Sequence, residues 1–124
     1  MLHLDHTIIP SHSQDEMATF IARMLGVTYE GRWNRFSPVH VDEHLSLDFA
    51  DREGDFRPEH FAFLASDQEF DEILERVKAE GVAYGSGPGQ QGDMEINHKH
   101  LGRGFYFRDP LDHHSWEIIT HTYV

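Results

Sequence analysis

Residues 3–26, HLDHTIIPSHSQDEMATFIARMLG, combine a short strand with an amphipathic helix. The stretch HLDHTII is typical of a strand, and the polar segment from Pro10 to Ser13 separates it from the helix. Gly26 is the expected end of that helix. The helix is predicted from apolar residues spaced i, i+3, i+4 and i+7, namely Met17, Phe20, Ile21 and Met24.

The same construction recurs in the second half of the chain. A strand signal at 59–64, EHFAFL, leads through Ser66 and Asp67 into a second helix pattern. The apolar stripe of the first helix reappears after a shift of 53 residues, from 17 to 70 (70 − 17 = 53). Each half is too small to bury a core alone, so we expect the two halves to pair in one domain.

Strand signals follow each helix, so we predict an α+β fold of two βαβββ modules whose paired sheets form a concave groove. We expect a single domain over residues 1–124, with module 1 at about 1–52, a linker at 52–57 and module 2 at about 58–124. The strands expected after the helices are 33–41 and 44–51 in the first half, and 82–84, 104–108 and 115–123 in the second.

Composition excludes several classes of function. The 124 residues include 10 Lys and Arg against 22 Asp and Glu, a net charge of −12, which disfavours nucleic acid and anionic membranes as partners. The chain has no cysteine, so disulfides, thiolate zinc sites and thiol nucleophiles are excluded. No signal peptide or apolar run of about 20 residues is found, and we expect a cytoplasmic protein.

Histidine is the unusual feature, with eleven in the chain. Side chains alternate along a strand, so if the bulky faces meet the helices, four polar groups share the concave face: His6, Asp48, His60 and Glu117. Such groups are costly there unless something binds them. Two histidines and a carboxylate on a common face form a recognised open site for a divalent metal.

A glycine-rich segment at 85–101, GSGPGQQGDMEINHKHL, interrupts the second half. Long segments of this kind are often functional, and we interpret it as a mobile lid; an ordinary surface excursion that contains part of a strand is the alternative. His98, His100 and Arg103, in or beside it, are candidates for substrate contact. A solvated polar loop explains them equally well.

Taken together, the repeat, LDHTII and EHFAF at equivalent places, and the ending GRGFYFRDP…HHSWEIIT resemble the vicinal oxygen chelate superfamily. This superfamily includes glyoxalases, extradiol dioxygenases, epoxide-opening thiol transferases and bleomycin-resistance proteins. The resemblance covers essentially the whole chain. It implies a glyoxalase-like fold, a small-molecule substrate and a homodimer, but one scaffold hosts many reactions.

The resemblance also implies a set of metal ligands. Its metal-binding members take a His from the first strand, a His from the strand opening the second half and a Glu from the last strand, which match His6, His60 and Glu117. Asp48 matches the fourth ligand of glyoxalase-like members but is a methylene shorter, so it is either a ligand or a group behind the ligands. Tyr106 is similar in place to the tyrosine of extradiol dioxygenases.

One turn departs from the pattern of the superfamily. Its usual sequence is similar to D-P-D-G-H-x-x-E, whereas this chain has DPLDHHSWE at 109–117, with one extra residue and His113 where glycine is usual. The spacing from His114 to Glu117 still matches. We therefore place the insertion in the turn and keep Glu117 as the ligand.

These features predict a metal-dependent enzyme that chelates two neighbouring substrate oxygens, with Fe, Mn, Ni or Zn as the metal. Asp48 places glyoxalase-like lyase or isomerase chemistry ahead of ring-cleaving dioxygenase chemistry. Glu117 and Asp48 are candidate proton carriers, and Tyr106 is a candidate catalytic residue. A metal-free drug-binding or metabolite-binding protein of the bleomycin-resistance type is the alternative from another class. Five residues are candidate substrate contacts: His44, His98, His100, Arg103 and His121.

Overall fold

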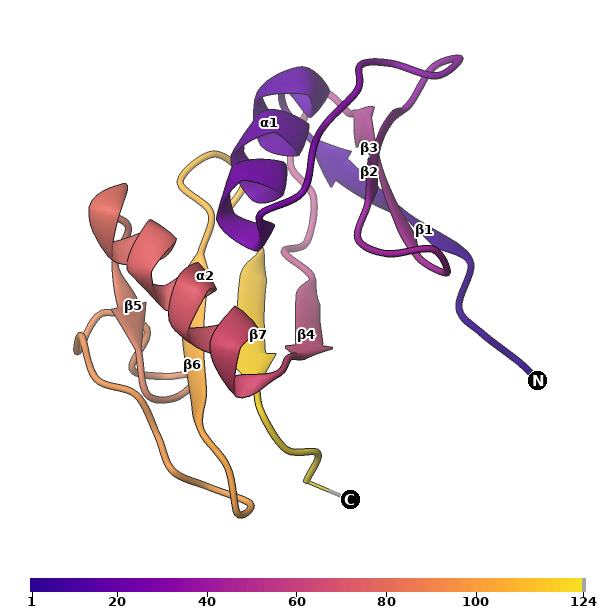
Figure 1. Cartoon of the computed structure of the whole chain (residues 1–124). Helices are drawn as coiled ribbons and strands as arrows, with labels where there is room; N and C mark the ends of the chain where they lie inside the picture. The colour runs from indigo at the N-terminus through magenta and orange to yellow at the C-terminus, as the bar shows by residue number, and fades with distance from the viewer. Residues whose placement is uncertain (124) are drawn as a thin grey trace. The chain divides into compact units, whose positions relative to one another are not determined.

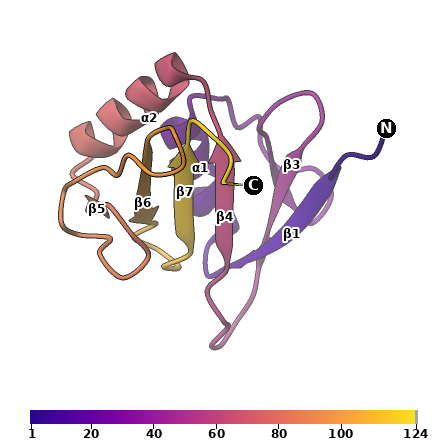
Figure 2. The same ribbon diagram turned by 90° about the horizontal axis from the view of Figure 1, so that it is seen from below.

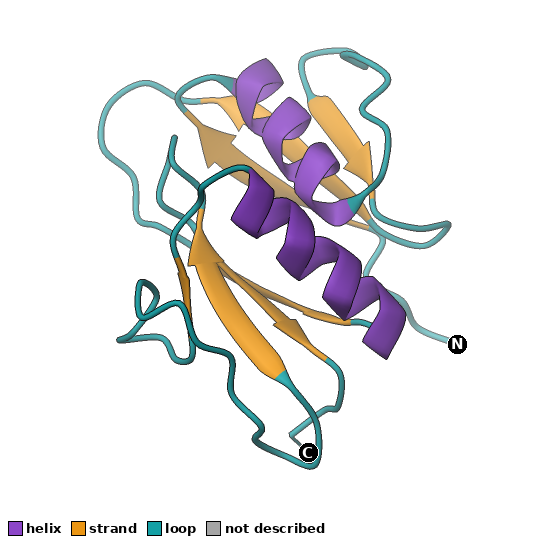
Figure 3. Ribbon diagram, turned by 60° about the vertical axis from the view of Figure 1, so that its left-hand side comes forward, coloured by secondary structure: helices purple, strands orange, loops and turns teal. Residues whose placement is uncertain are grey.

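A computed structural model describes residues 1–123 as two compact units, Met1–Arg57 and a second that begins at Pro58 (Figure 1). The boundary lies at the end of the predicted linker. Two helices and two mixed sheets confirm the α+β class, with one helix to each sheet (Figure 3). Unit 1 contains β1 (His6–Ser11), α1 (Gln14–Leu25), β2 (Ser37–His40) and β3 (Ser46–Asp51). Unit 2 contains β4 (His60–Leu64), α2 (Asp67–Ala79), β5 (Tyr84–Gly85), β6 (Gly104–Arg108) and β7 (Ser115–Ile119).

Unit 1 is built on the sheet β1-β3-β2, in which β1 pairs parallel and β2 antiparallel with β3. Alternation along the strands sends Ile9 and Phe49 into the core, where they are fully buried with Met17 and Ile21 of α1. The opposite face of β1 carries His6. The helix ends as predicted, because Gly26 adopts a left-handed conformation with φ of 78°.

The strand after α1 is shorter than predicted. Residues 33–41 were expected to be extended, but β2 begins only at Ser37. Trp33 and Phe36 instead close a tight turn, in which each backbone N–H donates to the other residue's carbonyl at 3.0 and 3.1 Å. Unit 1 has three strands, one at each position named from the sequence, where a full βαβββ module has four. The aromatic residues that favoured a strand lie in a turn, and Trp33 is 70% exposed.

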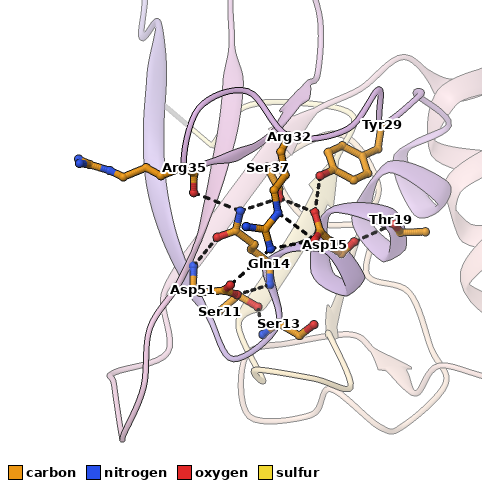
Figure 4. A network of polar contacts seen from close by, with 10 residues as sticks. All are labelled: Ser11, Ser13, Gln14, Asp15, Thr19, Tyr29, Arg32, Arg35, Ser37 and Asp51. Carbon is orange, nitrogen blue, oxygen red and sulfur yellow. Dashed lines mark hydrogen bonds and ion pairs between the residues drawn. The ribbon is translucent and has the colours of Figure 1, made fainter.

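A polar network ties the start of α1 to β2 and β3 (Figure 4). The Asp15 carboxylate accepts hydrogen bonds from the Tyr29 hydroxyl at 2.6 Å, the Ser37 hydroxyl at 2.9 Å and the Arg32 Nε at 3.0 Å. The buried Gln14 amide donates to Ser37, and its oxygen accepts the Asp51 backbone N–H at 2.7 Å. The hydrogen bond from Arg32, and then the hydrogen bond from Tyr29, lowers the pKa of Asp15 to about 2.

We expect Asp15→Asn to reduce stability at neutral pH and to remove part of its pH dependence. The folded pKa lies below the unfolded one, so the stabilisation is present above about pH 4 and is lost as pH falls through about 2. Asp15 is half exposed, so screening limits the loss to about 1 kcal/mol. Urea unfolding at neutral and acidic pH measures it. Glu16→Gln removes the same charge from the same helical turn as the control, and an equal loss in both variants would contradict the network.

Unit 2 is built on the sheet β4-β7-β6-β5, and α2 lies over one face of it (Figure 2). β4 pairs parallel with β7, and β6 pairs antiparallel with β7. The buried face carries Phe105, Phe107, Trp116 and Ile118, and Phe70 of α2 meets the Phe105 ring edge-on at 5.2 Å. The opposite face of β4, β6 and β7 is therefore left for polar side chains.

Both ends of α2 follow the expected chemistry. Ser66 forms a complete capping box with Glu69, in which each side chain accepts the other's backbone N–H at 3.1 and 2.9 Å. The last turn is basic and Gly81 follows with φ of 73°. No helix in the described part of the chain is long and apolar enough to cross a bilayer.

The turn between β6 and β7 is organised by one buried carboxylate. Asp109 is fully buried and accepts the backbone N–H groups of Asp112, His113 and His114 at 2.5 to 3.0 Å, together with the Trp116 indole N–H at 3.1 Å. His113 adopts a φ of 60°, the conformation for which glycine is usual. The extra residue of this turn sequence therefore lies between β6 and β7. The strand β7 still pairs Glu117 with Ala62 of β4, as the superfamily pattern requires.

Asp109→Ala is expected to destabilise unit 2 strongly. It would remove the side-chain acceptor of four N–H donors in a buried turn, of which the His113 N–H keeps the Asp109 backbone carbonyl at 3.2 Å, and this costs about 3 kcal/mol or more. Chemical denaturation followed by Trp fluorescence would report the loss. His113→Ala changes an exposed side chain of the same turn and should have little effect; a similar loss for the two variants would refute the role of the carboxylate.

Candidate functional site

Two of the predicted metal ligands meet in unit 2. The parallel register of β4 and β7 pairs His60 with Ser115 and Ala62 with Glu117, so alternation brings the two side chains to one face. His60 Nε2 lies 3.1 Å from Glu117 Oε1. The imidazole is 49% and the carboxylate 14% exposed, so the pair opens to solvent on the histidine side.

Tyr106 completes the polar face of this sheet. It is the register partner of Glu117 on β6, and its hydroxyl donates a hydrogen bond to the Glu117 carboxylate. Its ring centroid lies 6.0 Å from that of His60. Burial, and then the hydrogen bond to Glu117, raises the pKa of Tyr106 to about 12, so the phenol is a proton donor at neutral pH.

His6 and Asp48 belong to a cavity of about 620 Å³ in unit 1. His6 Nδ1 and Asp5 Oδ2 are 2.8 Å apart, and this hydrogen bond is the main reason that the pKa of His6 is raised, with the Asp48 charge contributing further. Asp48 accepts the Ser46 hydroxyl at 2.6 Å. His6 and Asp48 occupy in unit 1 the positions that His60 and Glu117 occupy in unit 2. His6 lies opposite Ser46 in the parallel pairing of β1 with β3, and Asp48 follows Ser46 by two residues.

The rest of this cavity contains residues that the sequence did not single out. Arg32, Trp33 and Phe36 come from the turn that replaces the predicted strand, and His40 comes from the end of β2. The His40 side chain is exposed, and it lines the cavity from the end of β2. The alternation of β2 is the signal that would have found it, because the buried Val39 implies that His40 lies on the opposite face.

The structure places the five candidate substrate-contact residues at separate points of the chain. His44 precedes β3, where its ring stacks on His3 at 4.3 Å, and it does not line the cavity of His6. Arg103 is held by Asp71 and Asp67 of α2 at 2.7 and 3.0 Å. His98, His100 and His121 are exposed in loops, with His100 5.7 Å from the Tyr123 ring and His121 Nδ1 2.6 Å from the Thr122 carbonyl. A role for these five residues stays a prediction.

Unit 2 on its own supplies two metal donors. Within residues 1–123, no three His, Asp or Glu side chains converge on one point. Imidazole nitrogen and carboxylate oxygen are donors suited to Fe, Mn, Ni or Zn, so the chemistry of His60 and Glu117 fits such an ion. A third donor must be added to complete the expected set.

Comparisons with known proteins identify the family of the chain. Residues 3–118 match the family profile described as "Glyoxalase/Bleomycin resistance protein/Dioxygenase superfamily". The chain belongs to this superfamily. The match confirms the resemblance drawn from the two strand motifs and the C-terminal pattern, and with it the glyoxalase-like fold.

Three relatives of the superfamily are close in sequence or structure. Glutathione transferase FosA of Serratia marcescens is 27% identical over 123 residues, which are 93% of this chain and 78% of the relative. The solved structure of oxidase ChaP-H1 is 41% identical, with a TM-score of 0.92 over 99% of this chain and 98% of its own. Oxidase ChaP-H2 is 38% identical, with a TM-score of 0.93 over 99% and 96%.

Glu117→Gln is expected to lower the pKa of Tyr106 from about 12 toward its ordinary value of 10. The substitution removes the anion that opposes the phenolate, while burial keeps part of the shift. Titration of the tyrosine ring carbons by NMR measures it. Asp48→Asn, a charge change in unit 1, is the control and should leave the Tyr106 titration unchanged. An unaltered Tyr106 pKa in Glu117→Gln would contradict the hydrogen bond.

Proposed function

We propose that the protein is a metal-dependent small-molecule enzyme in which His60, Glu117 and His6 hold a divalent ion. The observation that carries the proposal is the pair of His60 Nε2 and Glu117 Oε1, 3.1 Å apart on one sheet face. The two atoms that would bind the ion already face each other from neighbouring strands. An ion between them would also relieve the cost of a half-buried carboxylate.

His6 is the proposed third donor. It occupies in β1 the register position that His60 occupies in β4, opposite Ser46 and Ser115 respectively. It lines a cavity large enough for a small molecule. We further propose a homodimer, in which His6 reaches the pair from its own chain or from the partner.

When bound, the ion would accept two neighbouring substrate oxygens and lower the pKa of the groups it holds. The protein's own groups would orient the substrate and move protons. The Tyr106 hydroxyl keeps its single proton at neutral pH, and it would turn that O–H from Glu117 to a developing negative charge on a substrate oxygen once the carboxylate holds the ion. Trp33 and Phe36 provide apolar surface beside His6, and Arg32 provides a positive charge.

Among the reactions of the superfamily, we propose oxidase chemistry first. Oxidases ChaP-H1 and ChaP-H2 are more similar in sequence to this chain than the FosA relative is. Tyr106 lies beside the ligand pair, at the place where the sequence resembles extradiol dioxygenases. Glyoxalase-like lyase chemistry is the second candidate, because Asp48 shares the cavity of His6 and is available as a fourth ligand.

Metal content tests the central claim. Wild-type protein purified without chelator is expected to hold about one Fe, Mn, Ni or Zn ion per chain, and His60→Ala and Glu117→Ala should lose it. Binding to the folded state must also raise the melting temperature. His98→Ala, an exposed loop histidine, is the control and should retain the ion. A wild-type protein that gains neither metal nor thermal stability on titration with these ions would overturn the proposal in favour of a metal-free binding protein.

Activity separates the two chemistries. The loaded enzyme is assayed on catechols under air, with oxygen consumption measured, and on glutathione hemithioacetals without oxygen. Oxidase chemistry predicts oxygen uptake that falls at least about tenfold in Tyr106→Phe, because a positioned proton donor contributes 10²–10⁴-fold. Lyase chemistry predicts turnover of the hemithioacetal and loss of metal or activity in Asp48→Ala. Asp55→Ala, in the linker, serves as the control for both assays.

A further inference from the structure

A hydrogen-bonded chain links the glycine-rich segment of unit 2 to His60. The Gln91 side-chain amide donates to Ser115 Oγ at 3.0 Å, and Ser115 Oγ lies 3.1 Å from His60 Nδ1. The other ring nitrogen, Nε2, faces Glu117. Gln91 thus contacts the proposed metal ligand through a single hydroxyl group.

The partners determine the direction of each hydrogen bond. Gln91 Nε2 also lies 3.1 Å from the Pro88 carbonyl oxygen, which can only accept, so the NH₂ end of the amide faces both Pro88 and Ser115. The amide oxygen is buried without a hydrogen-bond partner among the described residues. Every hydrogen bond that the structure gives this side chain is therefore one in which it donates.

The hydrogen-bond partners of the His60 ring determine its tautomer in the same way. The Glu117 carboxylate accepts, so in the neutral imidazole the proton lies on Nε2 and Nδ1 is an acceptor. Because Gln91 already donates to the Ser115 oxygen, the Ser115 hydroxyl proton is directed to Nδ1. The equivalent serine of unit 1, Ser46, instead donates to Asp48 at 2.6 Å. The orientation of the hydroxyl thus differs between two serines at matching register positions.

Backbone packing holds Gln91 in place. A Cβ atom added to Gly85 would lie 1.5 Å from the Gln90 carbonyl oxygen, so only glycine allows the 90–91 peptide to approach β5. Ser86 and Asp93 close the base of this segment, with the Ser86 N–H donating to the Asp93 carboxylate at 3.0 Å. These contacts fasten the part of the segment that carries Gln91.

We propose that Gln91 is a positioning residue that orients His60 through the Ser115 hydroxyl. The inference rests on the proposed function in that His60 is taken as a metal ligand. With an ion on Nε2, Nδ1 must carry the proton and Ser115 Oγ accepts from both His60 and Gln91. The ring keeps Nε2 toward Glu117 in either state, which is the orientation that metal binding requires.

The decisive experiment is nitrogen NMR of the His60 ring in metal-free protein at about pH 8.5, well above the ordinary pKa of imidazole. The wild type is expected to show bare Nδ1 and protonated Nε2. Gln91→Glu replaces the donor by an acceptor of the same size, so the Ser115 hydroxyl turns toward the new carboxylate and Nδ1 loses its hydrogen bond, which shifts the Nδ1 resonance, while Nε2 keeps its proton toward Glu117. Gln90→Glu adds the same charge on an exposed neighbour and should leave the ring unchanged.

Three results would overturn the proposal. Protonated Nδ1 in the wild type overturns the proposal even if Gln91→Glu fails to fold, and so does a folded Gln91→Glu protein whose Nδ1 resonance is unchanged. In a Ser115→Ala background Gln91→Glu should have no effect on the ring, because the hydroxyl that carries the effect is absent. A surviving effect would also overturn the proposal.

Metal titration tests the link to function separately. Gln91→Ala is expected to weaken metal binding about tenfold, as removal of a group behind a metal-binding histidine does. An unchanged affinity would overturn the positioning role. A wild-type protein that binds no metal would refute the proposed function, whereas the tautomer measurement would still decide the hydrogen-bonded chain.

Discussion

The Asp109 carboxylate is the constraint on which the site in unit 2 depends. It fixes the three peptide N–H groups that precede β7 and the Trp116 indole within β7 itself. The first residue of that strand therefore pairs with His60 and no other, and Glu117 follows two positions later on the same face. A shift by one residue would turn Glu117 into the core and bring Trp116 to solvent. The position of the His60–Glu117 pair is thus set by a turn that contains neither residue.

Strand alternation explains why much of this could be predicted from the sequence. A period of two residues assigns His60 and Glu117 to one face once Phe61 and Trp116 are assigned to the other, and the structure stacks those two rings at 5.0 Å. The two helices could also be predicted, because the spacing of their apolar residues and their capping residues are local features of the sequence. The internal repeat also predicted, from the sequence alone, that His6 and His60 occupy equivalent positions in the two units.

Other features depend on contacts that no local pattern encodes. Arg103 resembled a substrate contact in the sequence, but in the structure its guanidinium lies 4.3 Å from the Phe70 ring and pairs with two aspartates of α2. The turn at Trp33 has the composition of a strand and was predicted as one. Gln91 lies in a segment without periodicity, so only its hydrogen bonds to the Pro88 carbonyl and the Ser115 hydroxyl show where its side chain lies.

The parallel pairing of β4 with β7 also determines when the site can form during synthesis. In unit 1 the last strand ends at Asp51, so that sheet is complete early in translation. In unit 2 the first strand must wait for the last, because among residues 1–123 its neighbour in the sheet is β7, which ends at Ile119. His60 emerges from the ribosome 57 residues before Glu117. For that interval β4 is an unpaired, half-apolar strand that can pair with other chains, and this strand carries the proposed metal ligand His60.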